Sequence, residues 1–576
     1  MTGLSSKLRD IDNRYHIWRA GLNARVRAIV SQPEPHVIGN AARGRQLLSG
    51  NFLFAGELVS APGTAIWDVK APTPAFTDAL HGFEWLDDLA AIGNGDPRAR
   101  STAQAWVHAW CTRFGAGRGP GWRADLAGSR VLRWITHAPF LLRALEADAS
   151  ATFFAQLARQ ASYLSHTWED APAGLPRFEA LAGLAYAGLS LEGAESHLKG
   201  ALAGLARECA STITAEGGLP SRNPEELAQV FARLVWCARS LEETGHTAPA
   251  ALGAAIDRMA PVLRNLRLMD GMLPHFHGGT RGMPGALEQA LAESGNTDAT
   301  RAKYAMGYCR MQAGRAVLLI DAAPLPDKSP TAHAAPLSFE MGSGRRLIVV
   351  NTGAGGMFGA AWTLAAREAE AHSGLTIAGA NPAKFVPGKG GATLLTEGPR
   401  TVTAERAIDR SGFWMLCSQD GFVPAFGLTH ERRLFLSPDG RDLRGEDTLS
   451  AQSTRDKGTL AAQIQSHGGT LPVICRFHLH PDVEAKLDMA GEAVSLTLLS
   501  GEVWVFRQSG GEITLEPSTY LDHRRLRPRA TKQIVVKCDL TGYGARVNWV
   551  FRRTEDGGRH TRDLMMPEQP GPDHAT

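Results

Sequence analysis

A glycine-rich loop, DGMLPHFHGGTRG (residues 270–282), places two histidines and an arginine close together in the chain. An unperturbed histidine has a pKa near 6.5, so His277 could donate or accept a proton at neutral pH, and we favour it as the titrating residue. The glycines leave the backbone free to bend over a ligand. The alternative is a flexible surface loop that takes no part in catalysis.

A second set of reactive side chains lies in the segment Arg222-Asn223-Pro224-Glu225-Glu226. A carboxylate in a dehydrated cleft has a raised pKa, which makes Glu226 a candidate base. A guanidinium can bind a uronate or sulfate through two hydrogen bonds, which makes Arg222 a candidate substrate-binding group, with a solvated loop arginine as the alternative. The segment is also a good helix start, with Asn223 as N-cap and proline at the first helical position. Both interpretations stay open.

Aromatic and polar side chains also recur at a spacing of four residues, in the pairs His81/Trp85 and Arg130/Trp134. Residues four apart share one face of a helix, and such a face suits stacking against a sugar. A tryptophan packed in a core explains the same spacing. Tyr308 begins a predicted strand near a domain junction and is a further candidate for proton transfer, with a packed strand tyrosine as the alternative. As base or acid it would need neighbouring cations to lower its pKa from about 10.

The apolar pattern along the chain predicts the elements that would position these side chains. Apolar residues follow helical spacing in the first half, whereas short runs rich in β-branched and aromatic residues follow in the second half. We therefore predict a multidomain α+β protein, with helices followed by an antiparallel β-sandwich. The predicted parts are an N-terminal arm (1–70), a helical domain (71–305), a β-sandwich (306–555) and a flexible tail (556–576).

Composition limits the class of protein. The 576 residues carry 61 Lys and Arg against 58 Asp and Glu, and 44% are hydrophobic, which excludes a disordered or collagen-like chain. A single core stops growing at roughly 250–300 residues, so two large domains are expected. The net charge of +3 gives no reason to expect nucleic-acid binding. We see no secretory signal, membrane helix or C-x-x-C pair, and expect a cytoplasmic protein without membrane insertion.

Three segments stand out beside the order of the two halves: AHAAPLSFEMGSGRRLIVVNTG (332–353), REAEAHSGLTIAG (367–379) and WRADLAGSRVLRWI (122–135). Together they resemble the heparinase II/III-like family of polysaccharide lyases. The resemblance covers most of the chain and implies an incomplete (α/α) toroid packed on the sandwich, with an acidic polysaccharide between them. It also implies β-elimination at a uronic acid. That reaction needs a group that neutralises the carboxylate, a base and an acid.

The chain departs from the family pattern at the positions that would supply those groups. Glu226 stands where the family has its catalytic tyrosine, and Thr331 stands where the family has a loop histidine. Arg177 and Glu179 are the nearest counterparts of an asparagine-histidine pair on a toroid helix. Substitute residues, or a protein that is not a conventional lyase, would explain this.

The resemblance also implies a metal site. His333, Asn351 and His372 fall where the family places the ligands of a structural zinc. Asn351 replaces an aspartate and removes the charge that offsets stripping water from the metal. We expect no required cofactor and treat this zinc as a hypothesis. The alternative is that the two histidines form hydrogen bonds at the domain interface.

Our first hypothesis is an enzyme that cleaves an acidic, uronate-containing glycan by β-elimination. The catalytic candidates are Glu226, His277 and Tyr308, and the candidate substrate-binding residues are Arg177, Arg222, Arg130, Trp134, His81 and Trp85. One alternative is a glycoside hydrolase that uses Glu179 and Glu226, about 5–9.5 Å apart across the scissile bond. Another is a non-catalytic glycan-binding or envelope-assembly protein. A homodimer is also left open.

Overall fold

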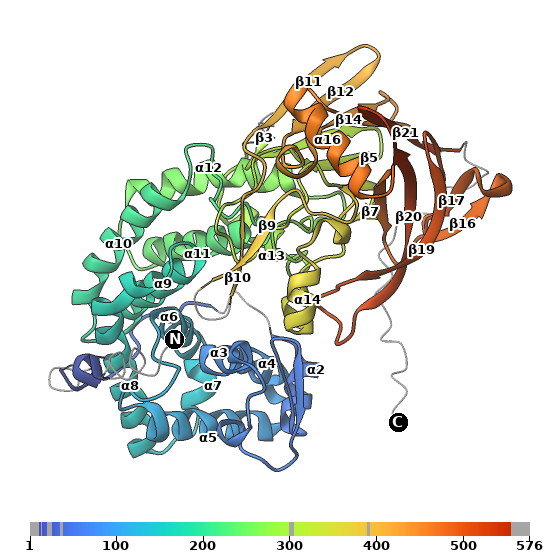
Figure 1. Ribbon diagram of the computed structural model, residues 1–576. Coiled ribbons are helices and arrows are strands. Elements are labelled where there is room, and N and C mark those ends of the chain that lie inside the picture. The colour runs from blue at the N-terminus through green and yellow to red at the C-terminus, as the bar shows by residue number, and fades with distance from the viewer. Residues whose placement is uncertain are drawn as a thin grey trace.

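The chain folds into a body of helices followed by a body of strands (Figure 1). The computed structural model describes residues 11–12, 14–19, 26–34, 39–298, 304–388 and 392–554. The predicted fold class, a helical toroid followed by an antiparallel β-sandwich, is confirmed. The predicted tail at 556–576 lies outside the described residues.

Helices α3 to α13 form the first body, and their ends follow local sequence signals. Thr73, Asp96 and Asn223 cap α3, α5 and α11 with side-chain oxygens that accept backbone N–H groups, and proline follows each cap. The bounds are α3 Pro74–Gly82, α4 Glu84–Ile92, α5 Pro97–Phe114, α6 Ala124–Thr136, α7 Ala138–Leu142, α8 Ala147–Thr167, α9 Leu175–Ser190, α10 Ser196–Thr212, α11 Pro224–Glu243, α12 Ala250–Leu266 and α13 Ala286–Glu293. None of the described helices combines the length and apolar character that a membrane crossing requires.

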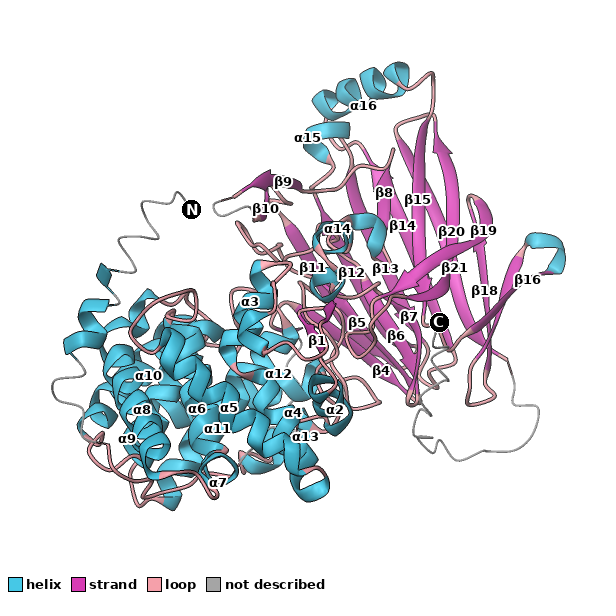
Figure 2. Cartoon of the chain, turned by 90° about the horizontal axis from the view of Figure 1, so that it is seen from below, coloured by secondary structure: helices cyan, strands magenta, loops and turns pink. Residues whose placement is uncertain are grey.

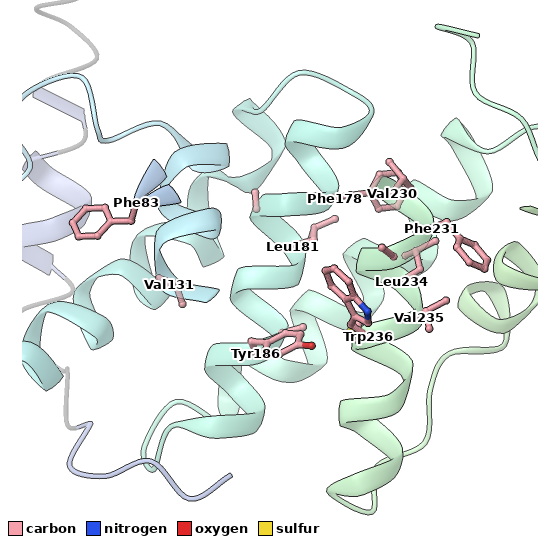
Figure 3. Close-up of a cluster of buried hydrophobic side chains, with 14 of the residues drawn as sticks. Phe83, Val131, Phe178, Leu181, Tyr186, Val230, Phe231, Leu234, Val235 and Trp236 are labelled. Atoms are coloured by element: carbon pink, nitrogen blue, oxygen red, sulfur yellow. The ribbon is translucent and has the colours of Figure 1, made fainter. Parts of the chain in front are cut away.

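Apolar side chains from facing helices fill the interior of this body. In Figure 3, Phe178 and Leu181 of α9 and Val230 and Leu234 of α11 belong to one buried cluster. Helices α6 and α9 approach most closely at glycines: a Cβ on Gly183 would lie 2.4 Å from the Gly128 carbonyl oxygen. Small residues at the crossing therefore set the distance between these two helices.

The segment before α3 packs on the helices. It contains α2 (Ala41–Leu48) and a hairpin of β1 (Asn51–Phe54) and β2 (Glu57–Ser60). Leu47, Phe52 and Trp67 belong to the same buried cluster as the helices. The part of the predicted arm that the structure describes from residue 39 onward is therefore continuous with the helical core.

Two antiparallel sheets form the second body (Figure 2). The inner sheet, next to the helices, has the order β19-β20-β15-β7-β6-β5-β4-β3, with β8 also paired to β15, and the outer sheet has the order β11-β12-β13-β14-β21-β18-β17-β16. The bounds in the inner sheet are β3 Tyr304–Ala305, β4 Tyr308–Ala313, β5 Ala316–Asp321, β6 Phe339–Ser343, β7 Arg346–Val350, β8 Leu375–Ile377, β15 Leu471–Leu479, β19 Glu512–Tyr520 and β20 Arg529–Leu540. Those in the outer sheet are β11 Val402–Asp409, β12 Gly412–Gln419, β13 Thr429–Leu436, β14 Asp442–Ser450, β16 Glu484–Asp488, β17 Ala493–Thr497, β18 Val503–Ser509 and β21 Gly544–Arg553.

Strands β4 to β7 of the inner sheet are buried on both faces. Leu318 and Ile320 of β5 pack with the outer sheet, whereas Val317 and Leu319 belong to the cluster of the helical body. The segments that connect the strands of the two sheets contain three short helices and one hairpin. They are α14 (Ala360–Ala365), α15 (Val423–Phe426), α16 (Thr454–Ser466) and the hairpin of β9 (Lys384–Pro387) and β10 (Thr393–Thr396). Because a continuous apolar surface joins the two bodies, polar side chains between them are removed from water.

Candidate functional site

The loop that carries His275 and His277 lies between the two bodies and is fully buried at both histidines. His277 Nε2 lies 3.1 Å from Asp321 Oδ2 at the end of β5. The backbone N–H of His277 donates to His333 Nδ1, and the backbone N–H of His333 donates to His277 Nδ1, each at 3.2 Å. These contacts bind the loop to the sandwich. The loop is buried at both histidines and is not the flexible surface loop of the alternative interpretation.

Burial and charge set the protonation of the His277–Asp321 pair. Burial lowers the pKa of His277 and outweighs the opposing effect of Asp321. Burial alone would raise the pKa of Asp321, but Arg222 and His277 together hold that pKa below its ordinary value. The pair is a neutral imidazole beside a carboxylate, enclosed by protein. In this arrangement the His277 ring is enclosed by protein and paired with Asp321.

Arg222 joins the helical body to the sandwich. Its guanidinium pairs with Asp321 and donates to the carbonyl oxygens of Met306, Gly307, Ala323 and Pro324. These acceptors lie on the strand side of the interface, whereas Arg222 comes just before Asn223, the N-cap of α11. The arginine that we predicted to bind a uronate therefore links the two bodies. We call the group of Arg222, Asp321, His277 and Tyr308 the interdomain clasp.

Tyr308 belongs to the same clasp. It is fully buried, its hydroxyl donates to the Arg222 carbonyl oxygen at 2.5 Å, and the Arg222 guanidinium lies 4.9 Å from its ring centroid. Burial raises the pKa of Tyr308 well above 10, despite the neighbouring guanidinium. A tyrosinate base is therefore disfavoured, and the packed-strand alternative fits the position.

The three residues predicted to hold zinc lie together, and each also has a backbone partner. His372 Nε2 is 2.6 Å from His333 Nδ1, whereas two nitrogens on a tetrahedral zinc would be about 3.3 Å apart. Asn351 Oδ1 accepts from Ser373 N at 3.1 Å, and its Nδ2 donates to the His275 carbonyl oxygen at 3.0 Å.

Within the described chain, no three or more His, Cys, Asp or Glu side chains are grouped so that they could hold a metal ion. His333 Nδ1 accepts from the His277 backbone N–H and His372 Nδ1 faces the Glu368 carbonyl oxygen, so the two nitrogens that face each other are both acceptors. The structural zinc stays a prediction, and we assign no chemical step to a metal.

The two aromatic-polar pairs lie inside the helical core. His81, Trp85, Arg130 and Trp134 are all buried. Arg130 donates to Gln160 Oε1 at 2.6 Å and lies 4.1 Å from the Trp110 ring centroid. Burial lowers the pKa of His81 to about 3, and Trp110 Nε1 donates to its Nδ1. The core alternative describes these residues, and a sugar could reach them only if the helices separated.

Arg177 braces a turn at the start of α9. Its guanidinium pairs with the buried Glu208 at 3.2 Å and donates to the carbonyl oxygens of Glu169 and Ala171. The side chain is 26% exposed. Arg177 therefore stabilises the turn before α9 at the edge of the helical body.

Two carboxylates remain partly open to solvent. Glu226 accepts from the backbone N–H of Leu175 at 3.2 Å, whereas Glu179 is 3.4 Å from Arg233 with its side chain 22% exposed. Burial raises the pKa of Glu179. Asn223 caps α11 as predicted, accepting from the backbone of Glu226 at 3.2 Å. Among the candidate carboxylates from the sequence, Glu179 and Glu226 both have some access to water.

Sequence analysis missed the two carboxylates that hold the interface together, Asp321 and Glu340. Glu340 Oε1 accepts from Asn351 N at 3.0 Å and lies 3.5 Å from His275 Nδ1. The signal was present, because each acid belongs to a strand of otherwise apolar or small residues. A charge in such a strand is buried and needs a partner.

Comparisons with known proteins agree with this architecture. A family model described as "Heparinase II/III-like, C-terminal" matches residues 297–550. FtsZ-localized protein C of Caulobacter vibrioides (strain NA1000 / CB15N) is 31% identical over 528 residues, which cover 89% of this chain and 88% of that protein.

Solved structures extend the likeness to both bodies. A crystal structure of heparinase III superposes with a TM-score of 0.67 at 14% identity, covering 96% of this chain and 92% of that one. A mutant of heparan sulfate lyase HepC from Pedobacter heparinus gives a TM-score of 0.57 at 14% identity, covering 95% of this chain and 88% of that one. At this identity the likeness shows the fold.

Proposed function

Because the chain belongs to the heparinase II/III-like family, we propose that it keeps the lyase scaffold for a non-eliminating role at the cell-division site. The observation that carries the proposal is the interdomain clasp of Arg222, Tyr308, His277 and Asp321. Each side chain that we considered for elimination at this interface is held by another protein group. The name of the relative, FtsZ-localized protein C, supports the proposed location.

The requirements of elimination explain why the clasp matters. The reaction needs a group for the uronate carboxylate, a base for the proton at carbon 5 and an acid for the leaving oxygen. Arg222 is engaged by five acceptors, and Tyr308 has a raised pKa and donates to a carbonyl. A substrate would have to displace these contacts and leave the buried Asp321 without its guanidinium partner.

A second candidate function is glycoside hydrolysis by Glu179 and Glu226. The observation that favours it is the difference between the two carboxyl groups: burial raises the pKa of Glu179, whereas the half-buried Glu226 accepts a backbone hydrogen bond. Hydrolysis uses two carboxyl groups in different roles, one as acid and one as base or nucleophile. Arg233, which pairs with Glu179, opposes the protonated form.

One assay separates the three chemical outcomes. The purified protein is incubated with heparan sulfate, chondroitin sulfate, alginate and polyglucuronate, and ultraviolet absorbance and reducing ends are followed together. We expect neither signal to rise. Absorbance from an unsaturated uronide would overturn the non-eliminating role. New reducing ends that appear without absorbance, and that are lost in Glu226→Gln, would establish hydrolysis.

The location is tested separately with a fluorescent fusion of the full chain in dividing cells that also carry labelled FtsZ. We expect the two labels to overlap at the division site. A fusion of full length that stays evenly distributed while FtsZ forms its band would overturn the proposed location.

A further inference from the structure

The outer sheet carries a groove of about 520 Å³ on its exposed face. This face points away from the helical body, because the opposite face of the outer sheet packs on the inner sheet, and the inner sheet packs on the helices. The strands that form the groove are β12, β13, β14, β21 and β18, which are neighbours in this order. The groove is therefore separate from the interdomain clasp.

A row of side chains crosses these five strands in register. Trp414 lies opposite Phe435, Phe435 opposite Arg444, Arg444 opposite Val550, and Val550 opposite Arg507. All five residues line the groove. Four strand spacings make the row about 19 Å long. It combines an aromatic end with two guanidinium groups along one line.

The aromatic end of the row is partly open. Trp414 is 38% exposed, and its ring centroid lies 4.5 Å from that of Phe435. The Arg444 guanidinium lies 5.6 Å from the Phe435 ring centroid. Water can be displaced from this apolar strip by a ligand that brings its own apolar group.

Positive charge dominates the rest of the groove. Among the described residues that line it, four are arginines and one is a carboxylate, Glu446, which lies 3.6 Å from Arg433. Asp442, beside the groove, holds Arg444 and Arg552 at 2.8 Å each. These two arginine side chains are nevertheless 59% and 62% exposed. The acidic residues orient the guanidinium groups and leave an excess of positive charge.

We propose that this groove binds an acidic peptide segment of a partner protein. An aromatic or aliphatic side chain of the peptide would contact Trp414, Phe435 and Val550, and its carboxylates would pair with Arg433, Arg444 and Arg507. Tryptophan and arginine are enriched among the residues that contribute most of the binding energy at protein interfaces. A guanidinium group binds a carboxylate through two parallel hydrogen bonds. The proposal does not rest on the proposed role at the division site.

The shape of the groove favours a peptide over other anionic partners. An anionic bilayer presents a broad surface, which does not follow a hollow in the face of a sheet. An acidic glycan supplies the charge but not an apolar side chain for Val550. An acidic peptide with an apolar side chain supplies both, and the volume lies within the roughly 300–1,000 Å³ typical of ligand sites.

The test uses the full-length protein and a short fluorescein-labelled peptide in which glutamate and aspartate flank one phenylalanine and one leucine. Fluorescence anisotropy should show saturable binding that weakens as salt is raised. We expect Trp414→Ala to weaken binding roughly tenfold or more. Arg444→Ala and Arg507→Ala should each weaken binding roughly three- to tenfold, because each removes one guanidinium–carboxylate pair.

Arg118→Ala is the matched control, since Arg118 is exposed on the helical body. It should bind as the unchanged protein does. Circular dichroism and melting curves check that each variant is folded. A peptide with lysine in place of the acidic residues should not bind, because the groove is positively charged.

Three results would overturn the proposal. They are no binding of the acidic peptide, binding that survives all three groove substitutions, or stronger groove-dependent binding of heparan sulfate or phosphatidylglycerol vesicles than of the peptide. The last result would assign the groove to a glycan or a lipid surface instead. Loss of peptide binding in the groove variants with retention in Arg118→Ala would support it.

Discussion

Replacement of Arg222 by alanine should uncouple the two bodies of this protein. The guanidinium is the donor for five acceptors across the interface, and its partner Asp321 is 1% exposed. Arg222→Ala leaves the Asp321 carboxylate with His277 as its side-chain partner in the clasp. A charge that loses its partner inside a protein cannot recover its hydration without opening the structure.

The expected loss of unfolding free energy is about 3–5 kcal/mol, the usual cost of removing one member of a buried ion pair. Arg222→Met combined with Asp321→Asn should cost less than the sum of the two single changes, because the uncompensated charge is gone. Lys384→Ala, which breaks the exposed pair with Glu397, is the control and should cost less than about 1 kcal/mol.

Urea unfolding followed by far-ultraviolet circular dichroism and tryptophan fluorescence measures these differences. In Arg222→Ala we expect the transitions of the helical and strand bodies to separate, since the clasp that links them has been removed. An Arg222→Ala protein whose unfolding free energy stays within about 1 kcal/mol of the unchanged protein would refute the assignment of Arg222 as a clasp.

Three further predictions concern single side chains. Burial lowers the pKa of His81 to about 3 from about 6.5 when unfolded, so the unfolded chain binds the extra proton between these values and stability falls as pH falls. His81→Gln should flatten that part of a plot of unfolding free energy against pH, and an unchanged slope would contradict it. Gly183→Ala should lower stability by about 1–3 kcal/mol, because its Cβ would meet the Gly128 carbonyl, and thermal melting at the level of the unchanged protein would exclude this close crossing. Tyr308→Phe should cost about 1 kcal/mol through its lost hydrogen bond, as measured in urea, whereas a gain in stability would argue against that bond.

Sequence patterns predicted a helix or strand well where its formation depends on residues next to it in the chain. The cap at Asn223 and the proline after it define the start of α11. The switch from helical spacing to short β-rich runs falls near β3, which begins at Tyr304. The hairpin before α3 was missed as such, because its stability depends on Phe52 and other residues packing against helices far along the chain.

The site was harder to predict because burial is a property of the assembled interface. His277 and its glycines fit a surface loop in sequence, yet the loop inserts between two bodies and His277 is fully buried. The spacing of Arg130 and Trp134 correctly placed them on one helix face. It could not show whether that face met solvent or other helices, since both cases produce the same period.

The sequence by itself therefore determined the order of the domains, several helix starts and the departure from the family pattern at Glu226 and Thr331, all of which are local or positional properties. Only the tertiary structure decided that Arg222, Tyr308 and His277 stabilise the interface, because their partners at Asp321 and His333 are distant in sequence. It also aligned Trp414 with Arg507 across the outer sheet. Strand pairing, not sequence spacing, sets which side chains share such a row.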